Sequence, residues 1–146
     1  MLKLYILVVA ISMMIACSKT SSQGVFLDMT IDLSIFSPEG SDLLNPENSR
    51  RLSTSDLSIF DETGESLDFN LLKVESKYVW RFFANEKITQ SEQEIYLKWS
   101  STNLVDTLLV QIERGDEFAS INEIELNGTE VYHSAKNELR IVTIVK

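Results

Sequence analysis

VFLDMTIDLSIF, residues 25–36, alternates apolar and polar side chains over its whole length and decides which fold is predicted. The apolar phase holds Leu27, Met29, Ile31, Leu33 and Ile35, and the polar phase holds Asp28, Thr30, Asp32 and Ser34. Successive side chains of a β-strand point to opposite faces of its sheet, so a period of two predicts a half-buried strand. A helix would scatter the same apolar side chains around its circumference and leave no apolar stripe.

Downstream of this strand, short apolar segments recur between clusters of turn residues. They occupy residues 57–60, 66–69, 78–84, 95–99, 108–112, 124–126, 131–132 and 139–145. About eight or nine strands at roughly ten-residue spacing, with no helical stripe, are typical of a two-layered fold. We therefore predict an all-β chain folded as an antiparallel two-sheet β-sandwich, immunoglobulin-like or related, with a small closed barrel as the alternative.

Three segments predict particular features of these sheets. Residues 78–84 carry bulky side chains on both phases and are expected to form a central strand. The apolar phase shifts by one residue between Leu71 and Leu72, which predicts a β-bulge or a chain that crosses from one sheet to the other. Asn127-Gly128 is the strongest short hairpin signal and predicts a tight turn between two strands.

Two polar segments are predicted to be connections between strands. Residues 37–54 contain both prolines of the chain and are expected to form a long loop, which Leu43 and Leu44 hold against the core. Residues 61–65 combine acidic side chains with Gly64 and predict a hairpin turn.

The first seventeen residues have the order of a lipoprotein export signal: one Lys, an apolar run from Leu4 to Ile15, the small Ala16 and the only cysteine, Cys17. A thiol directly after a small residue, at the end of such a run, is positioned for diacylglycerol attachment and for cleavage before it. We predict that residues 1–16 are a cleaved signal peptide and that a covalent lipid on Cys17 holds the protein at a membrane.

Two other interpretations of this segment are less favourable. An uncleaved anchor would place the polar residues 18–23 inside lipid, because a helix of about twelve residues reaches roughly 18 Å into the roughly 30 Å hydrocarbon core. A secretory signal cut before an ordinary cysteine would leave a free thiol in an oxidising compartment.

Residues 17–24 are small and polar and are predicted to be a flexible tether, followed by a single β-sandwich domain over residues 25–146. The chain has 13 basic and 22 acidic side chains. Because phosphate neutralisation by Lys and Arg supplies much of the affinity for nucleic acids, this composition disfavours them as partners. Cysteine is absent after Cys17, so we expect neither a disulfide nor a thiol catalyst in the domain.

No constellation of catalytic, cofactor-binding or metal-binding residues is evident in the sequence. His133 is the only histidine, which disfavours zinc coordination by imidazoles, and its polar surroundings predict a solvated loop. The acidic and amide side chains between Glu39 and Asn48 could bind calcium, but they lack EF-hand spacing and are the residues that turns require. Four aromatic side chains could form a stacking platform for a sugar, although their alternation with aliphatic residues favours core packing. They are Tyr78, Trp80, Tyr96 and Trp99.

The segments GSDLLNP, residues 40–46, and SDLSIF, residues 55–60, follow Cys17, the polar tether and the opening alternating strand. This combination resembles small uncharacterised lipoproteins of Bacteroidota, in the first half by these residues and in the second by the strand pattern. The resemblance implies an envelope location and a β-sandwich, and it brings no established activity. Surface export in that group tends to follow acidic residues just after the cysteine. Residues 18–20 include none, so the implied location is the outer membrane, facing the periplasm.

Two classes of function follow from these observations. The favoured one is a non-catalytic envelope module that binds a protein partner or a glycan through loops or an edge strand. The alternative is a carboxylate-dependent hydrolase acting on envelope glycans, although the sequence singles out no pair of acids. An open cleft with two facing acids would favour the hydrolase, whereas a filled interior and flat faces would favour the module. An assembly subunit, whose edge strand pairs with a neighbour, is a third reading.

Overall fold

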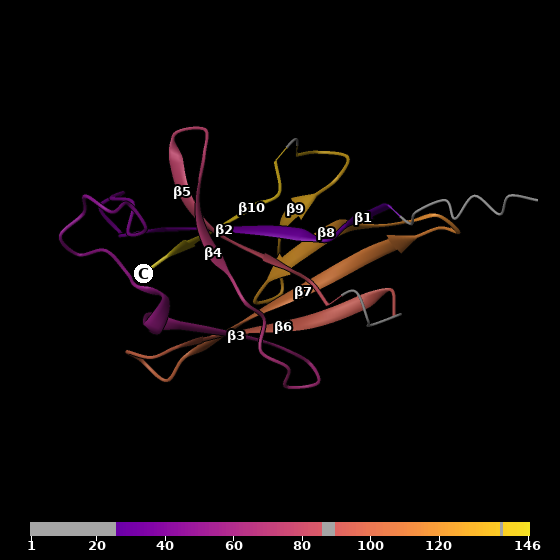
Figure 1. Ribbon diagram of the computed structural model, residues 1–146, viewed down its shortest axis with the longest axis horizontal. Helices are drawn as coiled ribbons and strands as arrows, with labels where there is room; N and C mark the ends of the chain where they lie inside the picture. The colour runs from indigo at the N-terminus through magenta and orange to yellow at the C-terminus, as the bar shows by residue number, and fades with distance from the viewer. Residues whose placement is uncertain (1–25, 86–89, 138) are drawn as a thin grey trace, which may run out of the picture.

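The computed structural model describes residues 26–85, 90–137 and 139–146. This part of the chain is all-β and contains no α-helix; a single 3-10 turn, η1 (Thr54–Asp56), precedes the third strand (Figure 1). The ten strands are β1 (Phe26–Asp28), β2 (Thr30–Phe36), β3 (Leu57–Asp61), β4 (Asn70–Val74), β5 (Lys77–Phe83), β6 (Glu92–Trp99), β7 (Val105–Arg114), β8 (Phe118–Leu126), β9 (Thr129–His133) and β10 (Ile141–Val145).

The strands form two sheets in a β-sandwich-like arrangement. The larger one, sheet A, has the order β1-β8-β7-β6-β3, and β9 pairs with the edge of β8 that β1 also uses. The smaller one, sheet B, has the order β10-β2-β5-β4. The three long strands β6, β7 and β8 lie side by side in Figure 1. The predicted all-β, two-sheet architecture is confirmed.

The prediction of a wholly antiparallel fold is wrong at two strand pairs. β1 runs parallel to β8, and β10 runs parallel to β2. The other six pairs are antiparallel. Parallel neighbours cannot be joined by a hairpin, and these partners lie far apart in the sequence, so no local turn signal could reveal them.

The alternating stretch that opens the chain forms two strands instead of one. β1 belongs to sheet A and β2 to sheet B, and Met29 lies at the switch between them. Met29, Ile31, Leu33 and Ile35 of the apolar phase are buried, as the alternation predicts, whereas Leu27 in β1 is 44% exposed. The prediction that the opposite phase faces water is wrong in β2, because Asp32 and Ser34 are buried as well. Asp32 is bonded to Arg81 and Ser34 to Thr143, so β2 is enclosed by strands on both of its edges.

One hydrophobic core fills the space between the sheets. Its largest fully buried side chains are Trp80 and Phe82 from β5, with isoleucines and leucines from β2, β3, β6, β7 and β8 around them. Burying a side chain of this size stabilises a fold by roughly 1.5–3 kcal/mol. The central position predicted for residues 78–84 is confirmed, since β5 lies between β2 and β4.

The predicted connections also hold the core in place. Leu43 and Leu44 of the long loop of residues 37–54 are buried; the amide of Leu43 donates to the carbonyl of Ile35, and the carbonyl of Leu43 accepts from the amide of Leu52. The turn at residues 61–65 forms around the Asp61 carboxylate, with Gly64 at φ 84°. The hairpin expected there is a single bridge between Phe60 and Ser66.

Beyond that bridge the chain leaves sheet A and enters sheet B as β4. The register between β4 and β5 runs without a shift, so Leu71 and Leu72 do not form a bulge. The crossing between sheets comes before Asn70, and within β4 Leu71 lies on the inner face of sheet B and Leu72 on the outer face.

The two C-terminal predictions are confirmed in their main points. Asn127 and Gly128 adopt φ angles of 52° and 79° and form the tight turn between β8 and β9. The last strand exists, but Val142 and Ile144 are its buried residues, whereas Val145 is exposed.

Candidate functional site

The outer face of sheet A, which points away from the core, is strongly acidic. The register of its strands places six glutamates and one lysine there: Glu92, Glu94, Glu113, Glu123, Glu125, Glu130 and Lys98. Glu125 lies directly opposite Glu130 across β8 and β9. Such a face keeps polyanions and other acidic surfaces away, and it contributes much of the net charge of −9.

The outer face of sheet B is different in character. Its charged side chains are Asp32, Lys77 and Arg81, and the rest of the face is uncharged. Half of its fourteen positions are apolar: Phe36, Leu72, Val74, Val79, Phe83, Ile141 and Val145. Phe83 and Val145 are about 60% exposed, at 62% and 60%. Val79, Asp32 and Ser34 at the centre of the face are buried, and the exposed apolar side chains are Leu72, Phe83 and Val145. Exposed apolar side chains opposite a charged face are typical of a surface that meets a partner.

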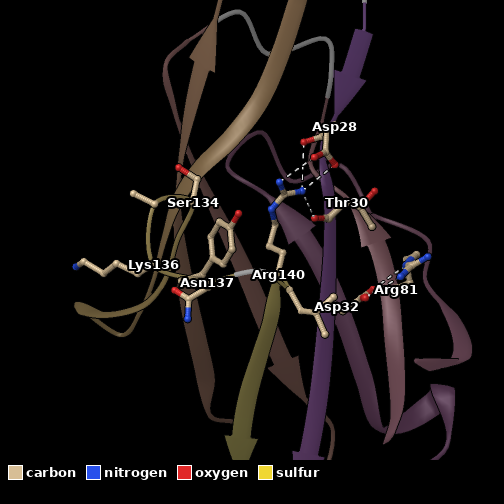
Figure 2. A pocket seen from close by; sticks show the side chains of 11 residues that line it. Asp28, Thr30, Asp32, Arg81, Ser134, Lys136, Asn137 and Arg140 are labelled. Carbon is tan, nitrogen blue, oxygen red and sulfur yellow. Dashed lines mark hydrogen bonds and ion pairs between the residues drawn. The ribbon is translucent and has the colours of Figure 1, made fainter. Parts of the chain in front are cut away.

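A shallow polar groove of about 900 Å³ lies where the β9–β10 connection rises beside sheet B. Asp28, Asp32, Arg81 and Arg140 line it together with polar side chains of residues 132–137, as Figure 2 shows. The sequence patterns did not predict this groove. Its only local signal was the pair of acids at positions 28 and 32, and their arginine partners, Arg140 in the β9–β10 connection and Arg81 in β5, are distant in the sequence.

Arg140 joins both sheets at one edge of the sandwich. Its guanidinium donates two hydrogen bonds to the Asp28 carboxylate, at 2.9 and 3.0 Å, and a third to the carbonyl of Thr30 at 2.8 Å (Figure 2). It also lies over the ring of Tyr132, 5.3 Å from the ring centre. The Nε atom is buried and has no acceptor among the described residues. Arg140 is therefore held by β1, β2 and β9 at once.

A second arginine pairs with the acid on β2. Arg81 donates from Nε and Nη2 to the two carboxylate oxygens of Asp32, each at 2.7 Å. Two parallel bonds of this kind fix the orientation of both groups. The Asp32 side chain is almost fully buried, whereas a third of the Arg81 side chain stays exposed.

These pairs decide what the two acids in the groove can do. The hydrogen bond from Arg140 outweighs the effect of burial and lowers the pKa of Asp28 below its ordinary value. A general acid in glycoside hydrolysis needs the opposite, a pKa raised toward neutrality. Both carboxylates are also fully engaged by guanidinium groups, so neither is free to take up a proton or attack a substrate in this arrangement.

The aromatic side chains do not form a common platform. Trp80 and Trp99 are buried in the core, where Phe69 packs against Trp80 with ring centres 5.1 Å apart. Tyr78 points into the sandwich from the same side of β5 as Trp80, while Tyr96 lies on the outer face of sheet A and bonds Glu94. The preference for core packing is confirmed for the two tryptophans.

The acidic and amide side chains of the long loop form turns. Asp42 accepts hydrogen bonds from the amides of Leu44 and Tyr78, and Asn45 and Asn48 accept from amides two residues further on. Within residues 26–85, 90–137 and 139–146, no group of three metal-ligating side chains is close enough to hold an ion. These oxygens therefore stabilise the loop itself.

His133 ends β9 and accepts a hydrogen bond from the amide of Ala135 through Nδ1. The predicted lipidation site, Cys17, lies outside the described residues. Along the described chain, no helix has the length and apolar character needed to traverse a bilayer. No family model, curated protein or solved structure matches the sequence.

Proposed function

We propose that this chain is a non-catalytic interaction module of the cell envelope, held at a membrane by lipid on Cys17, which meets a protein partner with the outer face of sheet B. The observation that carries the proposal is the contrast between the two outer faces. One carries six glutamates against one lysine, whereas the other is half apolar with a single acid.

The filled interior supports a binding role over a catalytic one. The core occupies the space between the sheets, and the polar groove on the surface is shallow, with its two acids each bonded to an arginine. A hydrolase needs a carboxylic acid that can donate a proton, and the lowered pKa of Asp28 opposes that role.

A protein partner fits this surface better than a glycan. Sugar-binding surfaces present exposed aromatic rings, whereas both tryptophans here are buried and Phe83 is the one aromatic side chain among the described residues that is exposed on the outer face of sheet B. Three apolar side chains are exposed on the outer face of sheet B, Leu72, Phe83 and Val145, and apolar contact of this kind favours another protein surface.

The proposed location is the outer membrane, on the side that faces the periplasm. The order of residues 3–17 and the resemblance to Bacteroidota lipoproteins support it. For the fold, we propose an immunoglobulin-like or related sandwich, which agrees with the number of short strands and with their division between two sheets.

Photo-crosslinking in the native envelope tests the binding surface. A photoreactive amino acid is placed in the full-length protein at Val145 or Leu72 on sheet B, or at Val105, which is similarly exposed on the outer face of sheet A. We expect adducts of a defined mass from the two sheet B positions and none from Val105. Adducts from Val105 alone, or equal adducts from all three positions, would reject the proposed surface.

A further inference from the structure

Sheet B is one strand narrower than sheet A. Sheet A is five strands wide, because β1 and β9 pair with the same edge of β8, whereas sheet B is four strands wide and ends at β4. No strand among the described residues pairs with the outer edge of β4. Natural sheets usually cover, charge or interrupt such an edge; β4 carries one charge, Lys73, but neither Pro nor a bulge.

The backbone groups on this edge are available for another strand. Ala84 donates to the carbonyl of Met29, so the even-numbered residues of β5 bond β2 and the odd-numbered ones bond β4. Lys77, Val79 and Arg81 accordingly bond Val74, Leu72 and Asn70. Leu71 and Lys73 therefore turn their N–H and C=O groups outward, away from β5.

The side chain of Leu71 shows that the core is open at this edge. Leu71 is paired with Trp80 and points toward the core, yet it is 42% exposed. Beside it lies a hollow of about 190 Å³, lined chiefly by Leu44, Leu52, Leu71 and Trp80. An apolar side chain from an added strand would enter this hollow and cover Leu71.

The charged side chains on β4 and in the lining of the hollow are basic, although the exposed acids Asp68 and Glu75 flank the strand. Arg51 lines the hollow, and Lys73 lies on β4 itself, over the ring of Tyr78. Neither has an ion-pair partner among the described residues. Their charges would complement acidic side chains on the added strand.

We propose that the outer edge of β4 is a docking site for an extended segment of a partner protein, with an apolar side chain seated beside Leu71 and acidic side chains next to Lys73 and Arg51. This binding mode is β-strand addition, in which main-chain hydrogen bonds give affinity and the hollow gives specificity. The inference rests on the proposed interaction function and names the chemistry of the partner.

The first experiment identifies the occupant. A photoreactive amino acid replaces Leu71 in the full-length protein in its own envelope, and mass spectrometry maps the crosslinked peptide. We expect a segment of another protein in which apolar and acidic side chains alternate. Crosslinks to residues 17–25 of the same chain, or to β4 of a second copy, would overturn the proposed occupant. Adducts from Val145 without any from Leu71 would reject this inference and leave the proposed function standing.

The second experiment uses the mapped segment as a synthetic peptide and the full-length protein in detergent micelles. We expect the peptide to slow amide hydrogen exchange at Leu71 and Lys73. Lys73→Pro removes an outward N–H without touching the β5 bonds and should weaken binding at least tenfold, whereas Lys73→Ala keeps that N–H and should weaken it less than Lys73→Pro does. Equal effects of the two variants, or unchanged exchange, would exclude strand addition.

A third variant keeps the test decisive if Lys73→Pro does not fold. Leu71→Asp places a negative charge against the acidic peptide and removes the apolar contact. Leu71→Val keeps an apolar side chain at this position and adds no charge. We expect loss of binding for the first and no more than a threefold change for the second. Full binding by Leu71→Asp would overturn the proposal.

Discussion

Arg140 holds together three strands that are distant in the sequence, and this predicts a large effect of its removal. Arg140→Met takes away the partner of Asp28 and the bonds to the Thr30 and Ile121 carbonyls. Breaking a partly buried ion pair of this kind costs about 2–4 kcal/mol of unfolding free energy. Urea denaturation measures this loss of unfolding free energy. The control is Lys98→Met on the outer face of sheet A, for which we expect a loss of less than about 0.5 kcal/mol. A similar loss in both variants would contradict the role given to Arg140.

Asp61 gives a prediction about acid stability. Burial raises the pKa of this carboxyl, but hydrogen bonds from Thr63, Asn85 and Glu65 outweigh it and hold the pKa below the usual value of 3.8. A lowered pKa in the folded state means that the stabilisation is present above about pH 4 and is lost as the pH falls through the folded pKa. Asp61→Asn should cost about 1–3 kcal/mol at pH 7 and make stability less dependent on pH below 4.

The control for Asp61 is Glu62→Gln, one residue further along the same turn. Glu62 is exposed and accepts one hydrogen bond, from the amide of Glu94. We expect its acid unfolding curve to match that of the unmodified protein. If Asp61→Asn and Glu62→Gln gave the same curve, the buried carboxylate would not be the acid-sensitive group.

Individual residues also show which features could be predicted from the sequence and which could not. The alternation in residues 25–36 correctly identified four buried apolar side chains, Met29, Ile31, Leu33 and Ile35, because burial of one phase follows from the strand period, but Leu27 in β1 is exposed. It placed Asp32 and Ser34 in water, since nothing local reveals that Arg81 and Thr143 will cover them from neighbouring strands. The groove was missed for the same reason: its ion pairs join residues 49 and 112 positions apart.

At the scale of elements, the β8–β9 hairpin depends on two residues with positive φ. Gly128 has φ 79°, a conformation that β-branched side chains strongly disfavour. Gly128→Val should cost about 1–3 kcal/mol of unfolding free energy, measured by thermal or urea unfolding. Thr129→Ala, the next residue along, provides the control and should change it by less than about 0.5 kcal/mol. Equal stability of Gly128→Val and the unmodified protein would show that the turn tolerates another geometry.

The elements that could be predicted were those with a local signal. The Asn127-Gly128 turn, the central strand β5 and the loop held by Leu43 and Leu44 all carry their pattern within a few residues. The parallel pairs β1·β8 and β10·β2 do not, because they depend on contacts between distant strands. The buried phase of β10 was not evident either, since apolar side chains occur on both of its faces.

For the whole molecule, the acidic outer face of sheet A predicts a response to salt. Glu125 stands opposite Glu130, and like charges directly opposite each other destabilise a sheet. Glu125→Lys should raise the urea midpoint at low ionic strength, and the gain should shrink in about 1 M NaCl, where charges are screened within about 3 Å. The urea midpoint of Glu125→Gln is expected to lie between those of the unmodified protein and Glu125→Lys. A gain that is independent of salt would point to packing as its cause.

Lipid attachment is the prediction on which the location of the whole molecule depends. Cys17→Ser should abolish labelling by a radioactive fatty acid and release the protein from membranes, or leave it with its signal uncut, because serine has no thiol to accept diacylglycerol. The domain itself should fold, since Cys17 lies outside the described strands. Unchanged labelling of the variant would exclude this attachment.

The switch of the opening strand from sheet A to sheet B has a mechanical consequence. A pull on the chain ahead of Phe26 reaches β1 first, and β1 is bonded to β8 over only three residues. Those bonds can break while β2, which is hydrogen-bonded to β10 and to β5, stays in place. Asp28, the last residue of β1, is also bonded to Arg140 through its side chain, so this ion pair resists the pull after the backbone bonds of β1 break, and β1 can detach from sheet A before the core is disturbed.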